Sequence, residues 1–457
     1  MKKLIRLAVA VAVVLPLSAC HIYNKYERPD DSAIINELTK ADQLQQDSTS
    51  LGNLSWKQVF TDPLLQSYID TALVRNKDLN NARLNVEIAQ AQLQGAKLSY
   101  FPSLAFTPNG GSASYGGSHM NWSYTLPLAA SWEIDVFGKI LNRKRGAKMG
   151  VEQAEAYRSA VQSQIIGAVA NTYYAIAALN MQLEVSRQTA VLWKEQVSSM
   201  ELMKNAGRVN EAAVVQTRAQ YYAILASIPD LETALRSMQN TMSLLLNEFP
   251  ADYQTTRDMT VSTPAEISEG VPMAYLAVRP DVAASERALA IAYYATNSAR
   301  AAFYPSLNIS AQGGFTNAIG SMIVNPGKWF IQLAGSLTAS IFSRGQNIAN
   351  LKAAKAQQQQ AMNNFEYTLL NAAAEVGDAM HTYTASKTKQ ELLAQQIDQL
   401  EKSVDYTNQL LTLGSATYLE VLTAQQGLLQ AQLSEINCWH SRVAALVNLY
   451  QSLGGGR

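Results

Sequence analysis

Cysteine is almost absent from this sequence of 457 residues, which contains only Cys20 and Cys438. Two cysteines allow at most one disulfide, and none within the mature chain if Cys20 is used for another chemistry. Cys438 lies in a helical, partly apolar stretch, where we expect a small buried side chain. The stability of the fold must therefore come from packing rather than from cross-links.

Neither sign of charge dominates the sequence. Its 36 basic and 36 acidic residues cancel, so nothing indicates a nucleic-acid partner. The four histidines are scattered and have no metal-ligand spacing. No nucleophile elbow, P-loop or dinucleotide-binding fingerprint occurs. We therefore expect no enzyme activity, no cofactor and no metal site.

Long hydrophobic runs are also missing once the first 19 residues are set aside. No later stretch reaches the roughly 18 consecutive apolar residues that a membrane-spanning helix requires. Lipid offers no partners for backbone polar groups, so the only other structure that can cross it is a closed β-barrel. If the mature chain crosses a bilayer, we expect it to do so with strands.

Residues 1–19 have the parts of a secretory signal peptide, with a basic start and a short apolar stretch. They end in Leu17-Ser18-Ala19-Cys20, which matches the bacterial lipobox, in which the cysteine is acylated and becomes the first residue. His21 follows Cys20, and the absence of aspartate there favours the outer membrane of a Gram-negative bacterium. We expect residues 20–61 to form a lipid-anchored N-terminal segment in the periplasm.

The chain is internally duplicated. Residues 89–111 align without a gap to residues 292–314, with seven of 23 positions identical, including a Pro-Ser-Leu run and a Gly-Gly pair. An internal period dictates architecture, and one of about 200 residues is too long for a solenoid unit. The predicted division of the chain is a first repeat over 62–248, a crossover linker over 249–278, a second repeat over 279–453 and a tail over 454–457.

Each copy contains a stretch with the two-residue period of strands, over about 103–134 and 306–341. Apolar residues alternate with Ser, Thr, Gln and Asn, and Asn317 to Lys328 is predicted as a loop. The strand lengths suit tilted membrane strands of about 9–11 residues. A soluble sandwich would alternate too, but it needs many more strands than these four.

The remaining sequence has a helical period and little proline or glycine. We predict helices over 62–100, 143–204, 211–248, 281–303, 350–412 and 416–453. Gly207 and Gly414 supply the left-handed geometry at which the long helices end. Pro229 is expected to kink or break the first return helix. Helices of this length need coiled partners.

Four membrane strands cannot close a barrel, and an open edge in lipid is forbidden, so the chain is predicted to oligomerise. A dimer would supply about eight strands, whose interior is filled by side chains, whereas a trimer or tetramer would enclose a lumen.

Short motifs give the chain a resemblance to a known family. They are Trp56, Phe60-Thr61-Asp62-Pro63-Leu64, Asn76-Lys77-Asp78-Leu79, Arg279-Pro280-Asp281-Val282, Glu286-Arg287-Ala288-Leu289, Tyr304-Pro305-Ser306-Leu307 and the lipobox. In this order they resemble the TolC-like outer-membrane factors, specifically the lipoprotein branch that serves RND-type efflux pumps. The resemblance covers nearly the whole mature chain.

The resemblance implies a mostly helical fold with a membrane β-barrel. In such a homotrimer a twelve-stranded β-barrel continues into a twelve-helix periplasmic α-barrel. It also implies a periplasmic adaptor protein, an inner-membrane RND-type transporter and outer-membrane lipid as partners. The implied function is a passive exit duct for small toxic compounds.

Candidate site residues lie at the two glycine turns. Those expected at the periplasmic tip and adaptor contact are Gly207, Arg208, Gly414 and Ser415. Those expected near the entrance constriction are Glu211, Tyr418, Leu419, Glu420 and Thr423. Family members often place an acidic ring at the constriction, and Thr423 stands where relatives carry aspartate. The alternative is that all of these are solvated helix-end residues. Arg279-Pro280-Asp281 is interpreted as structural.

Two other functions are weighed. A non-conducting periplasmic lipoprotein scaffold has no use for alternating strands. A type I protein-secretion exit channel fits the same architecture, but the lipobox and the efflux-type motifs favour efflux.

Overall fold

The computed structural model describes residues 23–28, 54–113, 121–257, 259, 276, 279–319 and 322–457. The chain forms two compact units. Unit 1 consists of Met1–Asp30, Leu84–Glu155 and Ala284–Tyr367, and unit 2 of Asp31–Arg83, Ala156–Ala283 and Thr368–Arg457. The predicted Cys20 lipidation site lies outside the described residues.

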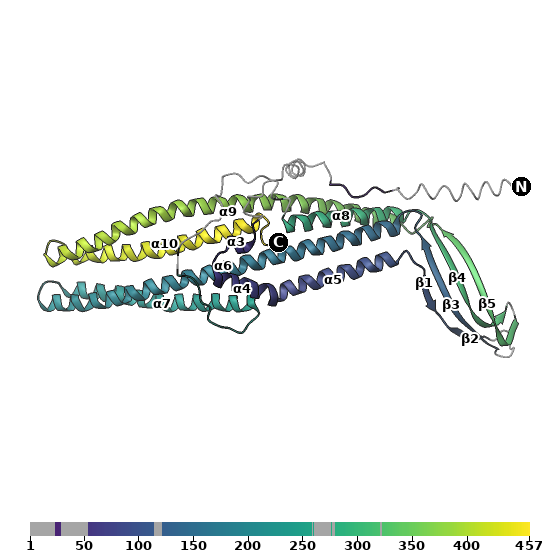
Figure 1. Cartoon of the computed structure of the whole chain (residues 1–457), viewed down its shortest axis with the longest axis horizontal. Helices are drawn as coiled ribbons and strands as arrows, with labels where there is room; N and C mark the ends of the chain where they lie inside the picture. Colours follow the sequence, from purple (N-terminus) through teal and green to yellow (C-terminus); the bar gives the residue numbers. More distant parts are fainter. Residues whose placement is uncertain are drawn as a thin grey trace. The chain divides into compact units, whose positions relative to one another are not determined.

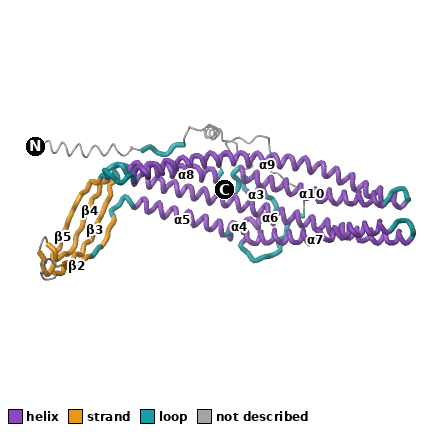
Figure 2. Tube along the Cα trace, turned by 180° about the vertical axis from the view of Figure 1, so that it is seen from behind, coloured by secondary structure: helices purple, strands orange, loops and turns teal. Residues whose placement is uncertain are grey.

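Unit 1 holds an antiparallel sheet, drawn in orange in Figure 2. Its strands are β1 (Ser103–Phe106), β2 (Asn109–Ala113), β3 (Asn121–Ile134), β4 (Ser306–Ile319) and β5 (Met322–Thr338). The order is β1-β3-β4-β5, and β2 also pairs with β3. Because β1 and β2 lie on the same side of β3, they act as one strand interrupted at Thr107-Pro108, where proline lacks a ladder donor. The predicted set of four strands is confirmed.

One prediction within the sheet is wrong. The strands continue through most of the stretch predicted as a loop, up to Ile319 and again from Met322. A register shift between Thr316 and Ala318 interrupts the alternation there. Such a bulge moves successive side chains off the two-residue period while pairing continues, so the period fails although the strand does not.

The register gathers apolar side chains on one face of the sheet. Leu128 lies opposite Phe106 and Gly313, and Leu333 lies opposite Ala311. The other face carries polar pairs, including a 2.6 Å hydrogen bond between Gln312 and Gln332. The exposed apolar side chains include Leu104, Phe106, Leu128, Phe315, Trp329, Ile331, Leu333 and Leu337. The sheet therefore has an unpartnered apolar face, and β1/β2 and β5 are its edge strands.

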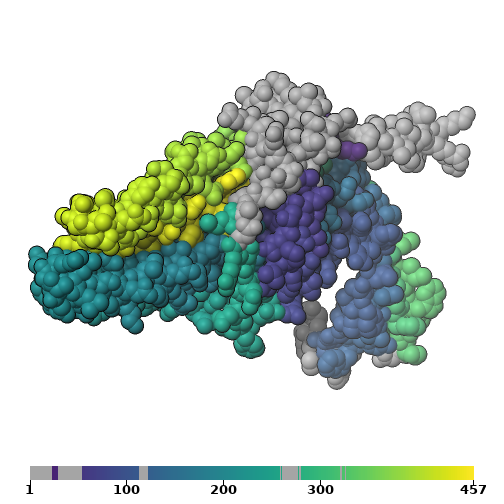
Figure 3. Space-filling model, turned by 60° about the vertical axis from the view of Figure 1, so that its left-hand side comes forward, coloured from purple at the N-terminus to yellow at the C-terminus, as the bar shows by residue number. Residues whose placement is uncertain are grey.

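Helices make up most of the rest of the described chain (Figure 1). They are α3 (Trp56–Val59), α4 (Pro63–Arg75), α5 (Lys77–Leu98), α6 (Lys139–Asn205), α7 (Glu211–Leu246), α8 (Pro280–Ala301), α9 (Gln346–Thr412) and α10 (Tyr418–Ser452). None of the described helices is both long and apolar enough to cross a membrane. In unit 2, the α6–α7 and α9–α10 hairpins lie side by side (Figure 3).

Two helix predictions need correction. The helix predicted over 62–100 is two helices that meet at Asn76, whose side chain caps α5 by accepting from the backbone N–H groups of Asp78 and Leu79. The same side chain donates to the Leu245 carbonyl at 3.0 Å, so tertiary contact favours the break. Pro229 does not break α7, which runs from Glu211 to Leu246.

Candidate site at the helical hairpin turns

The first hairpin turn joins α6 to α7. Gly207 has a φ of +74°, a backbone angle that residues other than glycine rarely adopt. Its N–H donates to the Lys204 carbonyl at 2.9 Å, and the Arg208 N–H donates to the Met203 carbonyl at 2.9 Å. These two hydrogen bonds satisfy carbonyl groups at the C-terminal end of α6. The Asn210 side chain then accepts from the Ala213 N–H and begins α7.

The second turn, between α9 and α10, repeats this geometry. Gly414 has a φ of +73°. Its N–H donates to the Leu411 carbonyl, and the Ser415 N–H donates to the Leu410 carbonyl at 2.9 Å. The two copies therefore reverse direction by the same backbone device, and the predicted placement of both glycines at hairpin ends agrees with the structure.

Ion pairs close the first hairpin near its turn. The Lys204 ammonium lies 2.7 Å from the Glu211 carboxylate, and Arg218 pairs with Glu201 across the same two helices. The hydrogen bond and positive charge of Lys204 lower the pKa of Glu211 below its ordinary value. Both pairs are solvent-exposed, so water and salt screen them and each contributes little to the stability of the hairpin.

A polar contact links the two hairpins. The Tyr418 hydroxyl, at the start of α10, donates to the Gln216 side-chain oxygen of α7 at 3.1 Å. The Tyr418 side chain also packs against a buried cluster that contains Trp193, Ile224 and Leu422. Gln216 is a residue that the sequence analysis missed, because no local pattern pairs residues 202 positions apart.

The remaining candidates are exposed at or near the turns. In the single protomer, the side chains of Arg208, Ser415 and Leu419 are exposed to solvent. The Glu420 carboxylate accepts from the Thr417 hydroxyl at 3.3 Å, and the Thr423 hydroxyl donates to the Leu419 carbonyl of its own helix. The structure therefore brings Tyr418 to the other hairpin, whereas the hydrogen bonds of Glu211 and Glu420 are to Lys204 and Thr417 of their own hairpins.

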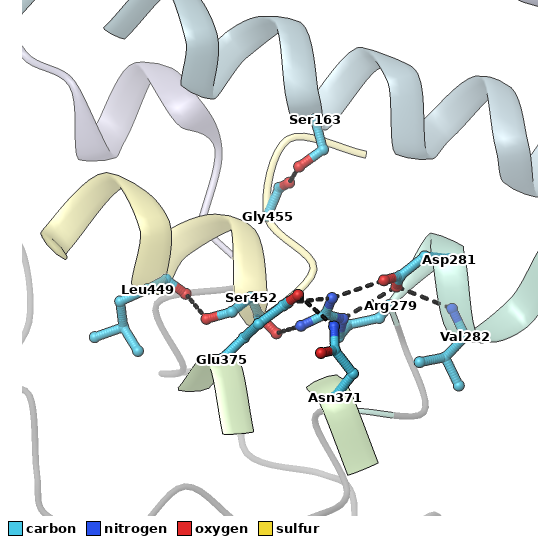
Figure 4. Close-up of polar contacts among 9 residues, drawn as sticks. All are labelled: Ser163, Arg279, Asp281, Val282, Asn371, Glu375, Leu449, Ser452 and Gly455. Atoms are coloured by element: carbon cyan, nitrogen blue, oxygen red, sulfur yellow. Dashed lines mark hydrogen bonds and ion pairs between the residues drawn. The ribbon is translucent and has the colours of Figure 1, made fainter. Parts of the chain in front are cut away.

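Away from the turns, a polar cluster surrounds the buried Arg279 side chain, just before α8 (Figure 4). Its guanidinium donates to Asp281 at 2.6 and 3.0 Å, to Glu375 at 2.7 Å and to the Ser452 carbonyl at 3.2 Å. Burial opposes ionisation of Asp281, but the hydrogen bonds and charge of Arg279 outweigh it and lower the pKa of that carboxyl. The cluster joins α8, α9 and α10, as a structural role requires.

The C-terminal glycines pack against the same region. The Ser163 hydroxyl donates to the Gly455 carbonyl at 2.5 Å, and Gly454 and Gly456 adopt positive φ values of 78° and 79°. In the part of the chain that the structure describes, no three His, Cys, Asp or Glu side chains form a group that could hold a metal ion.

Comparison with known proteins covers nearly the whole chain. The sequence model of the family described as "Outer membrane efflux protein" matches residues 68–248 and 271–455. The chain is 27 % identical to the probable outer membrane lipoprotein SilC of Salmonella typhimurium, over 98 % of each chain. It is also 27 % identical to the toluene efflux pump outer membrane protein TtgC of Pseudomonas putida, over 100 % of this chain and 96 % of that one.

A solved structure has the same fold. The crystal structure of CusC, a protein described as undergoing conformational changes that accompany folding and transmembrane channel formation, matches with a TM-score of 0.84. The sequence identity is 25 %, and the match covers 95 % of this chain and 100 % of that one.

Proposed function

The chain belongs to the outer membrane efflux protein family, and we propose that it forms the passive exit duct of a tripartite pump for small toxic compounds. It is an outer membrane protein. Its family consists of efflux channels, which are not enzymes. The observation that carries the proposal is the sheet with one apolar and one polar face. The apolar face fits lipid, and the polar face fits a water-filled lumen.

The proposed assembly is a homotrimer. The edges formed by β1/β2 and β5 leave backbone groups unpaired in a single chain, and lipid does not tolerate such edges. Three copies would close a barrel of about twelve strands, wide enough to hold a lumen. Their helical hairpins would form a periplasmic tunnel of about twelve helices.

The proposed partners are a periplasmic adaptor protein and an inner-membrane RND-type transporter. The adaptor would contact the hairpin turns at Gly207, Arg208, Gly414 and Ser415, which are exposed. Energy for transport would come from the inner-membrane transporter, because a passive duct only conducts what is delivered to it. Acylation of Cys20 would anchor the chain to outer-membrane lipid.

The first test measures conduction. Purified full-length protein in planar bilayers is expected to form channels, and electron microscopy of the same sample is expected to show hollow threefold particles. Deleting the gene is expected to sensitise cells to small toxic compounds. Solid or monomeric particles without conductance would contradict the duct and favour the scaffold. Unchanged drug susceptibility with a secreted protein retained inside the cell would favour protein secretion.

We also propose that Glu211, Tyr418, Leu419, Glu420 and Thr423 line or control the tunnel entrance. The Tyr418–Gln216 hydrogen bond supports this proposal, because it restrains one hairpin against the other. Opening the entrance would require the hairpins to separate, and this contact would oppose that separation.

Tyr418→Phe is expected to raise the open probability of single channels. The change removes one neutral hydrogen bond, about 1 kcal/mol per protomer, and keeps the ring that packs against Trp193. Each protomer would then shift toward the open state by about fivefold. The control is Tyr222→Phe, whose side chain is exposed. Equal open probabilities for both variants and the wild type would contradict the proposed role of Tyr418 in controlling the entrance.

A further inference from the structure

Positive charge is concentrated where the strands of unit 1 join their helices. The four connecting segments are residues 97–102, 135–148, 300–305 and 339–355. They contain ten basic residues and one acidic residue, although the whole chain is neutral. The basic residues are Lys97, Lys139, Arg143, Lys144, Arg145, Lys148, Arg300, Arg344, Lys352 and Lys355. We call these ten side chains the junction belt.

Most of the belt is exposed and free of acidic partners. Lys139 and Lys148 pair with Glu133 and Glu152 at 2.9 and 3.7 Å. Within the described part of the chain, no ion pair is formed by the exposed side chains of Lys97, Arg143, Arg300, Arg344, Lys352 and Lys355. Intramolecular salt bridges therefore do not account for most of the belt.

Helix stability does not account for it either. Lys139 and Arg143 lie in the first two turns of α6, and Arg344 lies two residues before the start of α9. Neither helix has an acidic residue in its first turn, although the Asp135 carboxylate, just before α6, accepts a hydrogen bond from the Leu141 N–H. Cations at a helix N-terminus oppose the macrodipole and cost free energy. An external anion at these positions would reverse that cost.

The same positions are basic in both copies of the duplicated chain. Lys97 and Arg300 each lie six residues before their strands, β1 and β4. Lys148 and Lys355 are separated by 207 residues, the same interval that separates Gly207 from Gly414. Charge therefore recurs at all four junctions around the base of the sheet.

Exposed aromatic and apolar side chains accompany the charges. Phe101 and Phe342 are 68 % and 83 % exposed. Phe137 stacks on Tyr304 with ring centroids 4.9 Å apart, and the Lys144 ammonium lies 5.4 Å from the Tyr100 ring. Aromatic rings and long basic side chains together are typical of the level where lipid hydrocarbon meets the headgroups.

We propose that the junction belt binds the phosphate headgroups of anionic phospholipids in the periplasmic leaflet. The inference rests on the proposed function, because it needs the sheet to lie in the bilayer. The apolar face of the sheet ends next to the belt, at Leu104, Ile134 and Leu307, so the basic side chains would meet the phosphates. Anionic headgroups would supply counter-charge for the belt residues that form no ion pair within the described part of the chain.

The test compares lipids retained by the full-length protein. Protein reconstituted in an equimolar mixture of phosphatidylglycerol and phosphatidylethanolamine is extracted in mild detergent, and the bound lipids are measured by mass spectrometry. We expect phosphatidylglycerol to be enriched severalfold. The triple variant Lys97→Gln, Arg300→Gln, Lys352→Gln is expected to lose most of that enrichment, since each basic residue near an anionic surface contributes about fivefold.

A matched control removes three exposed lysines of unit 2. The variant Lys77→Gln, Lys194→Gln, Lys387→Gln has the same change in net charge and should retain the wild-type enrichment. Retained enrichment in the belt variant, or equal loss in the control, would overturn the proposal. So would displacement of the lipid by inorganic phosphate beyond that caused by chloride at equal ionic strength, because the belt would then be a free-phosphate site.

Conductance of the same preparations separates this proposal from the duct. Wild-type channels that conduct but show no enrichment of phosphatidylglycerol would overturn only the proposal that the junction belt binds lipid. A wild-type protein that forms no channels would overturn the proposed function and the belt with it. Conducting belt-variant channels that have lost enrichment would support both.

Discussion

Replacing Gly314 with alanine is expected to prevent assembly of the conducting channel. Gly314 lies in β4 between its two partner strands, opposite Pro127 of β3 and Phe330 of β5. A Cβ atom at this position would lie 2.0 Å from the Leu126 carbonyl oxygen and 2.9 Å from the Pro127 Cα. Both are backbone atoms and cannot rotate away, so the β3–β4 ladder would have to separate. We expect a cost of about 3 kcal/mol or more for each protomer.

The sheet offers a control of the same chemistry. Gly335→Ala in β5 places its Cβ in open space, with no atom within 4 Å. Both variants add one methyl group to a strand, and only the first meets backbone. Conductance in planar bilayers and the fraction of trimer on a sizing column should fall for Gly314→Ala and stay at wild-type values for Gly335→Ala. Normal channels from Gly314→Ala would mean that the strand pairing described here is not the one in the membrane.

This contrast also shows what sequence can and cannot predict in the sheet. The duplication aligns Gly110-Gly111 with Gly313-Gly314, so the sequence marks all four glycines equally. Only the strand pairing shows the difference between them. A Cβ atom added at Gly314 would meet backbone atoms, whereas one added at Gly111 would have no atom within 4 Å. The alternation of apolar and polar residues predicts the two faces, because side-chain direction has a period of two. It does not predict the bulge at Thr316, where that period fails.

The helices also have features that the sequence predicts and features that it does not. The long helices and their glycine ends are predictable, because they depend on composition and on one backbone angle at each turn. The break at Asn76 depends on a hydrogen bond to the Leu245 carbonyl, far along the chain. In the candidate site, sequence places Tyr418 near the turn, but its partner Gln216 follows only from how two hairpins align. Long-range register is a tertiary property and leaves no local pattern.

The second large effect is expected from Arg279→Met, which should destabilise unit 2. The Arg279 side chain is only 7 % exposed, whereas its partners Asp281 and Glu375 are 43 % and 46 % exposed. Removing the cation leaves two neighbouring carboxylates without compensation and the Ser452 carbonyl without this donor. Breaking a buried pair costs about 3–5 kcal/mol, and we expect the lower end, because water can still reach both acids. Thermal unfolding followed by circular dichroism measures the change.

Arg287→Met is the matched control. Arg287 pairs with Glu152 at 3.0 Å, and both side chains are about one-third exposed. It also lies 3.9 Å from Glu286, which keeps Arg28 as a partner at 2.9 Å, so loss of Arg287 should cost about 1 kcal/mol or less. Equal falls in melting temperature for the two variants would mean that burial of Arg279 adds nothing to its ion pairs. The comparison therefore isolates the contribution of burial from that of charge.

Acid should reveal the same cluster. Arg279 holds the pKa of Asp281 below its ordinary value in the folded protein, so the folded state binds this proton less tightly than the unfolded state. That contribution to stability is fully present above the ordinary aspartate pKa of about 4 and is lost as pH falls through the lowered folded value. Arg279→Met removes the cation that lowers the pKa. Its deficit relative to wild type should therefore be largest at neutral pH and should shrink below about pH 4. A deficit that stays constant down to acid pH would show that Asp281 is not stabilised by Arg279, and that the loss comes from packing alone.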